Sequence, residues 1–226
     1  GFAIAGTVPI GLTNPLYVNT SASPPAFDLA GIGPKLTGCG YIKNPTTGFF
    51  TMADGTPIRF SILTPPKDYD PVRADAAIMI SNNLKSVGLD IDAAPTSFDT
   101  ILTKAFSQPV DFDMYILGFS FGDFPEAYLC GFFCINQDVN LNPAGSNSAG
   151  YHNPVVDALI TKATQTLTTT TRVPNVKHVE GIVTNDIPWN VLYYKKTISP
   201  YRTDTWHGWT DVSGGGSGNN GIYNFW

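Results

Sequence analysis

Five segments between residues 57 and 117 alternate between strand-like and helix-like patterns, and this order constrains the fold more than any other feature of the chain. Apolar residues alternate or run continuously in three of the segments, and they recur at every third or fourth position in the other two. The segments predict, in order, a strand at 58–63, a helix at 70–88, a strand at 89–94, a helix at 97–106 and a strand at 112–117. This strand–helix order with short links predicts an α/β fold with a mostly parallel central sheet flanked by helices.

Local signals mark the ends of the two predicted helices. Asp70 and Pro71 are typical of an N-cap followed by a proline in the first helical turn. Gly88 is typical of a C-terminal cap, and Ser97 is a good N-cap for the second helix. The boundaries therefore agree with the periodicity.

The second half of the chain continues with helices. The segment at 153–167 begins with Asn-Pro and carries apolar residues on one face, which predicts a helix. Four consecutive threonines at 168–171 predict a turn, because threonine is a poor helix former. A further helix is expected at 173–185, followed by a strand at 187–194.

The amino-acid composition is more typical of an extracytoplasmic protein than of a cytosolic one. The chain is 42% hydrophobic but only 14% charged, and its formal net charge is −5. A low charge content suits an extracytoplasmic protein, and the 13 basic residues form no stripe that would neutralise a phosphate backbone. Nucleic acid is therefore not expected as a partner. The chain begins at Gly1 without a methionine, as in a mature or shortened chain from which an anchoring segment has been removed.

Three cysteines are present, at positions 39, 130 and 134. Cys130 and Cys134 are four residues apart, so they form either a disulfide in an oxidising compartment or two small buried residues on one helical face. A zinc site is not expected, because no Cys or His pair has the spacing that completes four ligands.

The segment 118–122 has the pattern G-x-S-x-G after a predicted buried strand, which is the setting of a nucleophilic serine in α/β-hydrolases. Ser120 is the candidate nucleophile, His207 the candidate base, and Asp157, Asp186 or Asp204 the candidate third member. Two observations oppose this interpretation: no upstream oxyanion segment is recognisable, and Asp123-Phe124-Pro125 interrupts the helix that should follow the serine. A serine hydrolase is therefore kept as the alternative function.

Aromatic residues gather in or beside the predicted loops, where exposed rings can line a concave site and stack on peptide side chains or sugar rings. These residues are Phe119, Phe121, Phe124, Tyr128, Tyr151, Trp206 and Trp209. The group favours a binding site. By contrast, Asp123 and Glu126 near a helix start are more typical of helix-stabilising acids than of a glycosidase pair.

Five segments resemble motifs of one family, the extracytoplasmic solute-binding proteins of the oligopeptide, dipeptide and nickel type that serve ABC importers, often called family 5. The segments are LTGCGY at 36–41, NNLKSVGLDI at 82–91, FDM with GF at 112–119, GYHNPVVDALI at 150–160 and DIPWNVLYY at 186–194. They extend over roughly residues 35–209 and are similar to the C-terminal lobe only. The resemblance implies a type II periplasmic-binding-protein-like lobe. It further implies a monomeric protein that is extracellular or periplasmic and, at full length, anchored to the membrane. Such a protein binds a peptide or oligosaccharide and delivers it to the permease subunits of an ABC importer. The resemblance implies neither catalysis nor a cofactor.

In peptide-binding members of the family, an Asp shortly after a Gly-Trp pair holds the amino terminus of the ligand. Here Phe119 replaces the Trp, and the nearest acid, Asp123, stands about one residue later, so the resemblance leaves peptide and oligosaccharide ligands both open. The ligand-binding residues are predicted to be Gly118, Phe119, Ser120, Asp123, Tyr151, Arg202, Trp206 and Trp209. No catalytic or metal residue is predicted. The predicted domains are a connecting segment at 1–52 from an N-terminal lobe, the ligand-binding lobe at 53–200, and a return segment with a Gly/Asn-rich tail at 201–226.

Overall fold

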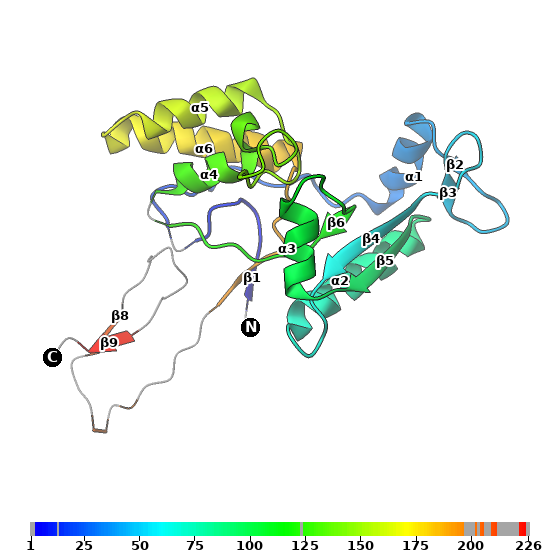
Figure 1. Cartoon of the computed structure of the whole chain (residues 1–226), viewed down its shortest axis with the longest axis horizontal. Coiled ribbons are helices and arrows are strands. Elements are labelled where there is room, and N and C mark those ends of the chain that lie inside the picture. Colours follow the sequence, from blue (N-terminus) through cyan, green and yellow to red (C-terminus); the bar gives the residue numbers. More distant parts are fainter. Residues whose placement is uncertain are drawn as a thin grey trace. The chain divides into compact units, whose positions relative to one another are not determined.

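The computed structural model describes residues 3–12, 14–122, 124–196, 202, 204–205, 209–211 and 222–224. The chain divides into two compact units. Unit 1 comprises Gly1–Pro25 and Phe119–Trp226, and unit 2 comprises Ala26–Gly118. Figure 1 labels the helices and strands of both units.

Unit 2 contains the predicted parallel sheet. Its strands are β4 (Arg59–Thr64), β5 (Asp90–Pro95) and β6 (Met114–Tyr115), in the spatial order β5-β4-β6. Both neighbours of β4 run parallel to it, with Phe60 opposite Ile91 and Ile62 opposite Met114. The predicted α/β fold is therefore confirmed.

Two helices of unit 2 pack on this sheet. Helix α2 (Pro71–Ser86) contacts β4 and β5, and α3 (Phe98–Phe106) contacts β4 (Figure 1). The predicted caps are present: the Asp70 side chain accepts from the Arg73 N–H at 3.1 Å, and Ser97 Oγ accepts from the Thr100 N–H at 3.2 Å. These strand–helix connections are the right length for parallel neighbours, as the sequence predicted.

The segment at 26–52 carries more regular structure than a connecting segment requires. Helix α1 (Leu29–Gly38) is capped by the Asp28 side chain, and a short hairpin pairs β2 (Ile42–Lys43) with β3 (Phe50–Thr51). No residue of α1 is buried, whereas both residues of β3 are.

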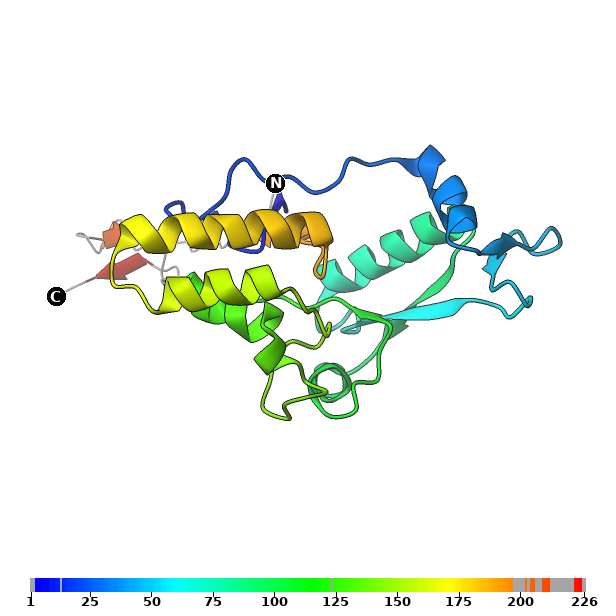
Figure 2. The same cartoon turned by 90° about the horizontal axis from the view of Figure 1, so that it is seen from above.

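Unit 1 is mainly helical. It contains α4 (Pro125–Phe133), the short 3-10 helix η1 (Ile135–Gln137), α5 (Pro154–Thr164) and α6 (Thr169–Asp186). Helices α5 and α6 lie side by side, and α4 packs against α5 (Figure 2). Two antiparallel strand pairs complete the unit, β1 (Ala3–Ala5) with β7 (Tyr193–Lys195) and β8 (Trp209–Asp211) with β9 (Ile222–Asn224).

The core of unit 1 is formed by one face of each of these three helices and by the N-terminal segment. Its buried residues are Val8, Ile10, Tyr17, Val18, Leu129, Phe133, Cys134, Val156, Ile160, Ala163, Val176, Val179 and Val183. Burial of these side chains drives the helices together, since each large apolar side chain contributes roughly 1.5–3 kcal/mol when removed from water.

Buried polar groups hold the N-terminal segment on this core. Glu180 of α6 is completely buried, and its carboxylate accepts from the backbone N–H groups of Ile10 at 3.1 Å and Asn19 at 2.5 Å. The Tyr194 hydroxyl donates to the Val8 carbonyl at 2.6 Å. A segment without regular structure is thereby fixed, because its buried backbone groups find side-chain partners.

Three predicted elements differ from the observed ones. Strand β6 is shorter than predicted because the Asp113 carboxylate, rather than a backbone carbonyl, accepts from the Ser61 N–H at 2.9 Å. The predicted turn at 168–171 is wrong: α6 begins at Thr169, and Thr168 precedes it as the cap residue. The strand predicted at 187–194 is reduced to β7, because Ile187 adopts a left-handed conformation with φ 53° that ends α6.

Within the part of the chain that the structure describes, no helix is long and apolar enough to cross a membrane. The Gly/Asn-rich tail lies almost entirely outside the described residues.

Candidate ligand-binding site

The predicted contact residues Gly118, Phe119 and Ser120 follow strand β6, whose two residues are partly buried. Ile116 is buried and its N–H donates to the Leu63 carbonyl at 2.9 Å, so the chain leaves the sheet in a fixed direction. Gly118 is exposed and is the last residue of unit 2. The Arg73 guanidinium lies against it, 2.9 Å from the place that a β-carbon would occupy. A larger residue at position 118 would have to displace this side chain.

Phe119 opens the part of the loop that belongs to unit 1, and it joins an aromatic cluster. Its ring stacks on Trp189 with centroids 4.9 Å apart and an interplanar angle of 17°. It also contacts Phe132 of α4 at 4.7 Å. Phe119 is nevertheless 39% exposed, so its ring remains accessible while its neighbours fix its orientation. A fixed and accessible ring is suited to stacking on a ligand.

The aromatic cluster extends from Phe119 to the core. Its members are Phe119, Phe121, Tyr128, Phe132, Phe133, Tyr151 and Trp189. Trp189 is at its centre, with Phe132 at 4.4 Å and Phe133 at 5.1 Å. Because Phe133 is fully buried and Phe119 is exposed, the cluster connects the core to the surface.

Sequence reasoning missed Trp189 as a site residue, because the segment around it was predicted to be a strand. In the structure Trp189 follows the left-handed Ile187 and precedes β7, so it lies in a loop. A proline at position 188 was the signal that argued against a central strand.

Tyr151 is the second predicted site residue that the cluster contains. Its ring packs edge-on against Phe133 at 6.1 Å, and its hydroxyl donates to the Asp186 carboxylate at 2.6 Å. Burial, and then the hydrogen bond to Asp186, raises the pKa of Tyr151 to about 12. The same hydrogen bond is the main cause that lowers the pKa of Asp186. Tyr151 therefore stays protonated near neutral pH and supports the cluster as a neutral hydrogen-bond donor.

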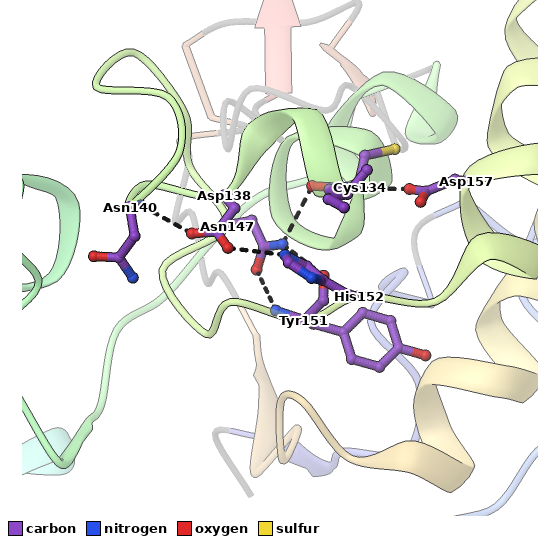
Figure 3. A network of polar contacts seen from close by, with 8 residues as sticks. Cys134, Asp138, Asn140, Asn147, Tyr151, His152 and Asp157 are labelled. Carbon is purple, nitrogen blue, oxygen red and sulfur yellow. Dashed lines mark hydrogen bonds and ion pairs between the residues drawn. The ribbon is translucent and has the colours of Figure 1, made fainter.

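Asn147 fixes the backbone of Tyr151 (Figure 3). Its side chain accepts from the Tyr151 N–H at 3.1 Å and donates to the carbonyls of Tyr151 and Cys134, at 2.9 and 3.2 Å. The neighbouring His152 contacts Asp138 at 2.9 Å, and Asp138 also accepts from the Asn140 N–H at 2.8 Å. The loop between η1 and α5 is thus ordered by its own side chains.

The arrangement around Ser120 does not match a nucleophile elbow. Ser120 is exposed, but α4 begins at Pro125 instead of directly after the serine. Gly122 lies against Tyr128, whose ring carbon is 3.1 Å from the place of a β-carbon, and its carbonyl accepts from the Asn14 side chain at 3.3 Å. The second glycine of the pattern therefore serves close packing of the loop. His207, the predicted base, lies outside the described residues.

Glu126, in the first turn of α4, is buried and forms an ion pair with Arg172 at 3.4 Å. The Arg172 guanidinium also lies over the Phe124 ring at 5.4 Å. A buried carboxylate that is paired in this way holds α4 against α6. This supports the helix-stabilising interpretation over a glycosidase pair.

The remaining predicted residues are not joined to the cluster by the structure. Asp123 and Trp206 lie outside the described residues, and the side chain of Trp209 in β8 is likewise not described. Arg202 is exposed and pairs with Asp204 at 2.6 Å. The predicted residues that the structure brings together are thus Phe119 and Tyr151, with Gly118 and Ser120 adjacent to Phe119 in the chain. Among the described residues, no group of three or more His, Cys, Asp or Glu side chains is placed to hold a metal ion.

Comparison with known proteins gives matches in structure only. A scan against protein-family models and a search of curated protein sequences gave no match. Among solved structures, NikZ from Campylobacter jejuni in complex with Ni(L-His) matches with a TM-score of 0.71 and 21% identity. AppA from Bacillus subtilis, an oligopeptide-binding protein in complex with a nonapeptide, matches with a TM-score of 0.73 and 20% identity. The periplasmic oligopeptide-binding protein of Thermotoga maritima bound to mannohexaose matches with a TM-score of 0.70 and 17% identity.

These matches cover most of this chain but a minor part of the matched proteins. The alignments cover 86%, 85% and 85% of this chain and 37%, 37% and 36% of the three proteins, respectively. At these identities the likeness establishes the fold, which is that of part of a periplasmic binding protein. The resemblance to family 5 solute-binding proteins seen in the sequence motifs is confirmed at the level of the fold.

Proposed function

We propose that this chain is part of an extracytoplasmic solute-binding protein of the oligopeptide, dipeptide and nickel type, and that it binds a peptide or another small solute without catalysis. The whole protein would be anchored outside the membrane, act as a monomer and deliver its solute to the permease subunits of an ABC importer. The structural likeness over about 85% of the chain supports this assignment, as do the five sequence segments that resemble the family.

One observation supports Phe119 as the central contact. Its ring stacks on Trp189 and is also held by Phe132, yet it stays 39% exposed. A ring fixed by two neighbours loses little conformational entropy when a ligand stacks on it, which favours binding. Both apolar peptide side chains and sugar rings present faces that pack on such a ring.

The backbone beside Phe119 adds polar groups to the proposed contact. Ser120 is exposed, and the Gly122 carbonyl is held in place by the Asn14 side chain at 3.3 Å. Hydrogen bonds to a ligand main chain or to sugar hydroxyls fit this arrangement. A small number of polar groups beside an aromatic surface is typical of small-molecule sites.

The ligand class is tested by a thermal-shift and calorimetric screen of the 226-residue chain against three sets of compounds. The sets are peptides of two to nine residues, oligosaccharides including mannohexaose, and the nickel–histidine chelate, matching the ligands named for the similar structures. Since the chain spans about 37% of the matched proteins, affinity should be weak. A ligand with a Kd of about 1 mM, added at about 10 mM, stabilises the folded chain by about 1.4 kcal/mol and raises Tm by roughly 3–5 °C.

Phe119→Ala should weaken binding of the best ligand roughly tenfold, since a stacked aromatic contact contributes about 1 kcal/mol or more. Phe27→Ala is the matched control, because Phe27 is 88% exposed and belongs to unit 2. The proposed site is wrong if the two variants bind equally well. The proposed function is wrong if no compound of the three sets stabilises the chain.

The hydrolase alternative has one observation in its favour, the exposure of Ser120. It predicts covalent labelling of Ser120 by a serine-directed phosphonate probe, detected by intact mass. Labelling that is lost in Ser120→Ala would replace the binding function by catalysis. Labelling that is absent, together with a positive ligand screen, would support the binding function.

A further inference from the structure

The two cysteines at the end of α4 lie in direct contact. Cys130 is in the last turn of the helix and Cys134 is its C-terminal cap, and the Cys134 N–H donates to the Cys130 carbonyl at 3.0 Å. The side chain of each cysteine is the main influence on the pKa of the other. Cys130 is half-buried, whereas Cys134 is only 5% exposed. One thiol of the pair is therefore accessible to a reagent, and the other is held next to it in the protein.

The surroundings of the pair distinguish the two sulfurs. Asp157 lies beside Cys134 (Figure 3), and its carboxylate accepts from the Ile135 N–H at 3.1 Å. The Cys130 sulfur is 3.9 Å from the Asn136 side-chain oxygen. A thiolate is less favourable at Cys134, which is buried and close to a carboxylate, than at Cys130.

The direction of the pKa shifts agrees with this difference. The hydrogen bond from Cys134 lowers the pKa of the Cys130 thiol. The hydrogen bond to Cys130, together with burial, raises the pKa of the Cys134 thiol. Cys130 is thus both the more accessible thiol and the one that ionises first, which makes it the better nucleophile.

We propose that Cys130 and Cys134 form a reversible intramolecular disulfide by exchange with a low-molecular-weight disulfide such as oxidised glutathione. In the first step the Cys130 thiolate attacks one sulfur of that disulfide, a mixed disulfide forms, and one glutathione thiolate leaves. In the second step the Cys134 sulfur, having lost its proton to solvent, attacks the Cys130 sulfur and releases the second glutathione thiolate. The two cysteines lose two electrons in total, and the glutathione disulfide gains them.

The end of a helix is a place where such a bond can close. In a regular helix the β-carbons of residues four apart are roughly 5–6 Å apart, whereas a disulfide needs roughly 3.5–4.5 Å, so the turn has to tighten by about 1.5 Å. Cys134 has an extended ψ of 145°, which ends α4 and separates it from the 3-10 helix η1 that begins at Ile135. A β-carbon at Gly131 would meet no atom within 4 Å, so the turn has room to adjust.

The bond would act on the aromatic cluster, because Phe132 and Phe133 lie between the two cysteines. Phe132 contacts Phe119 at 4.7 Å, and Phe133 contacts Trp189 at 5.1 Å. Closing the loop from residue 130 to residue 134 restrains the turn that carries both rings. In an oxidising compartment the disulfide would therefore restrain Phe132 and Phe133 within the cluster. Reduction of the disulfide would remove this restraint.

The test uses Cys39→Ser, because Cys39 is exposed and would otherwise form intermolecular disulfides. The folded variant is incubated with oxidised glutathione, quenched with acid and freed of glutathione. It is then denatured and alkylated with iodoacetamide at mildly alkaline pH, where free thiols react as thiolates, and its intact mass is measured. The expected product has lost the mass of two hydrogen atoms and takes up no alkyl group, and dithiothreitol restores two alkylation sites. In a second variant that also carries Cys134→Ala, Cys130 should instead keep a glutathione adduct.

A second measurement needs no variant: the unaltered protein is oxidised, alkylated and digested, and the peptide that contains both cysteines is examined for an internal disulfide. Two free thiols after oxidation would overturn the proposal. A glutathione adduct on Cys130 that persists when Cys134 is present would also overturn it. Far-UV circular dichroism checks that each variant is folded before oxidation.

Discussion

Glu180 offers a direct test of how the N-terminal segment is held in unit 1. The residue is completely buried in α6, and each of its oxygens accepts from a backbone N–H, that of Ile10 at 3.1 Å and that of Asn19 at 2.5 Å. Burial raises the pKa of Glu180 to about 7, although the two N–H groups and Lys177 favour the charged form. Glu180 is therefore protonated in the folded protein at a pH where it is ionised in the unfolded chain.

The sign of the pH effect follows from this difference. Below pH 4.5, the unperturbed value, both states carry the proton and Glu180 causes no pH dependence. Between that value and about 7, unfolding releases a proton, so the free energy of unfolding decreases as the pH rises. At about 1.4 kcal/mol for each pH unit, the whole window amounts to about 3 kcal/mol.

Glu180→Gln removes this titration and provides the measurement. The amide keeps one acceptor oxygen, but its NH2 group faces the second backbone N–H, which costs about 1–3 kcal/mol independently of pH. We expect the wild type to be more stable than the variant at pH 4.5. The free energy of unfolding of the wild type, relative to that of the variant, should fall by about 3 kcal/mol by pH 8. Urea unfolding followed by far-UV circular dichroism, at constant ionic strength, gives both curves, and other titrating groups cancel in their difference.

Lys177→Met tests one of the causes that set the pKa of Glu180, the charge of Lys177. Because the Lys177 charge lowers the pKa of Glu180, its removal should move the midpoint of the pH dependence upward. Parallel curves for the wild type and Glu180→Gln would refute the reasoning, since they would mean that the buried carboxyl has the same pKa in both states. A difference that grows with pH would refute its sign.

Two further predictions concern stability. Phe133→Ala should lower the free energy of unfolding by about 3–5 kcal/mol, because the ring is fully buried in the core. Leu167→Ala is the control: its side chain is 96% exposed, so the loss in free energy of unfolding should be less than about 0.5 kcal/mol. Urea unfolding measures both. Similar losses for the two would contradict the observed core. Asn153→Ala should cost about 1 kcal/mol in thermal unfolding, because the side chain caps α5 by accepting from two backbone N–H groups. Asn153→Ser keeps an acceptor and should restore most of the loss; no recovery would mean that the cap is not the cause.

Local periodicity predicted the sheet and helices of unit 2 well, because their signals are contained in neighbouring residues. Asp70 and Ser97 cap helices as predicted, and β4 and β5 are paired in the expected parallel order. The shortened β6 was not predictable in this way. Its limit depends on a hydrogen bond between Asp113 and Ser61, which are 52 residues apart.

In unit 1 the errors also come from partners that are distant in the sequence. The low helix propensity of threonine predicted a turn at 168–171, but the Arg172 side chain, which the first turn of α6 positions, donates to the Thr166 carbonyl at 3.0 Å and pairs with Glu126. Such contacts outweigh a propensity difference of a few tenths of a kcal/mol per residue. The hydrogen bonds from the N-terminal segment to Glu180 could likewise not be predicted from the sequence, because an isolated Glu in a helical pattern is usually exposed.

The candidate site shows the same division between local and distant information. Phe119 and Tyr151 were predicted as site residues from the sequence. In the structure the aromatic cluster connects them through Trp189, which lies 70 positions from Phe119 and stacks on it with ring centroids 4.9 Å apart. The G-x-S-x-G pattern is likewise explained by contacts with residues outside it: Gly122 packs against the Tyr128 ring, and its carbonyl accepts a hydrogen bond from the Asn14 side chain. The G-x-S-x-G pattern thus indicated only that the backbone passes close to other groups. Whether such a pattern belongs to a nucleophilic serine or to a binding loop depends on the residues around it, which the pattern does not contain. Here the neighbours of Gly122 are the Tyr128 ring and the Asn14 side chain, and neither is the histidine base that a serine nucleophile of this kind needs.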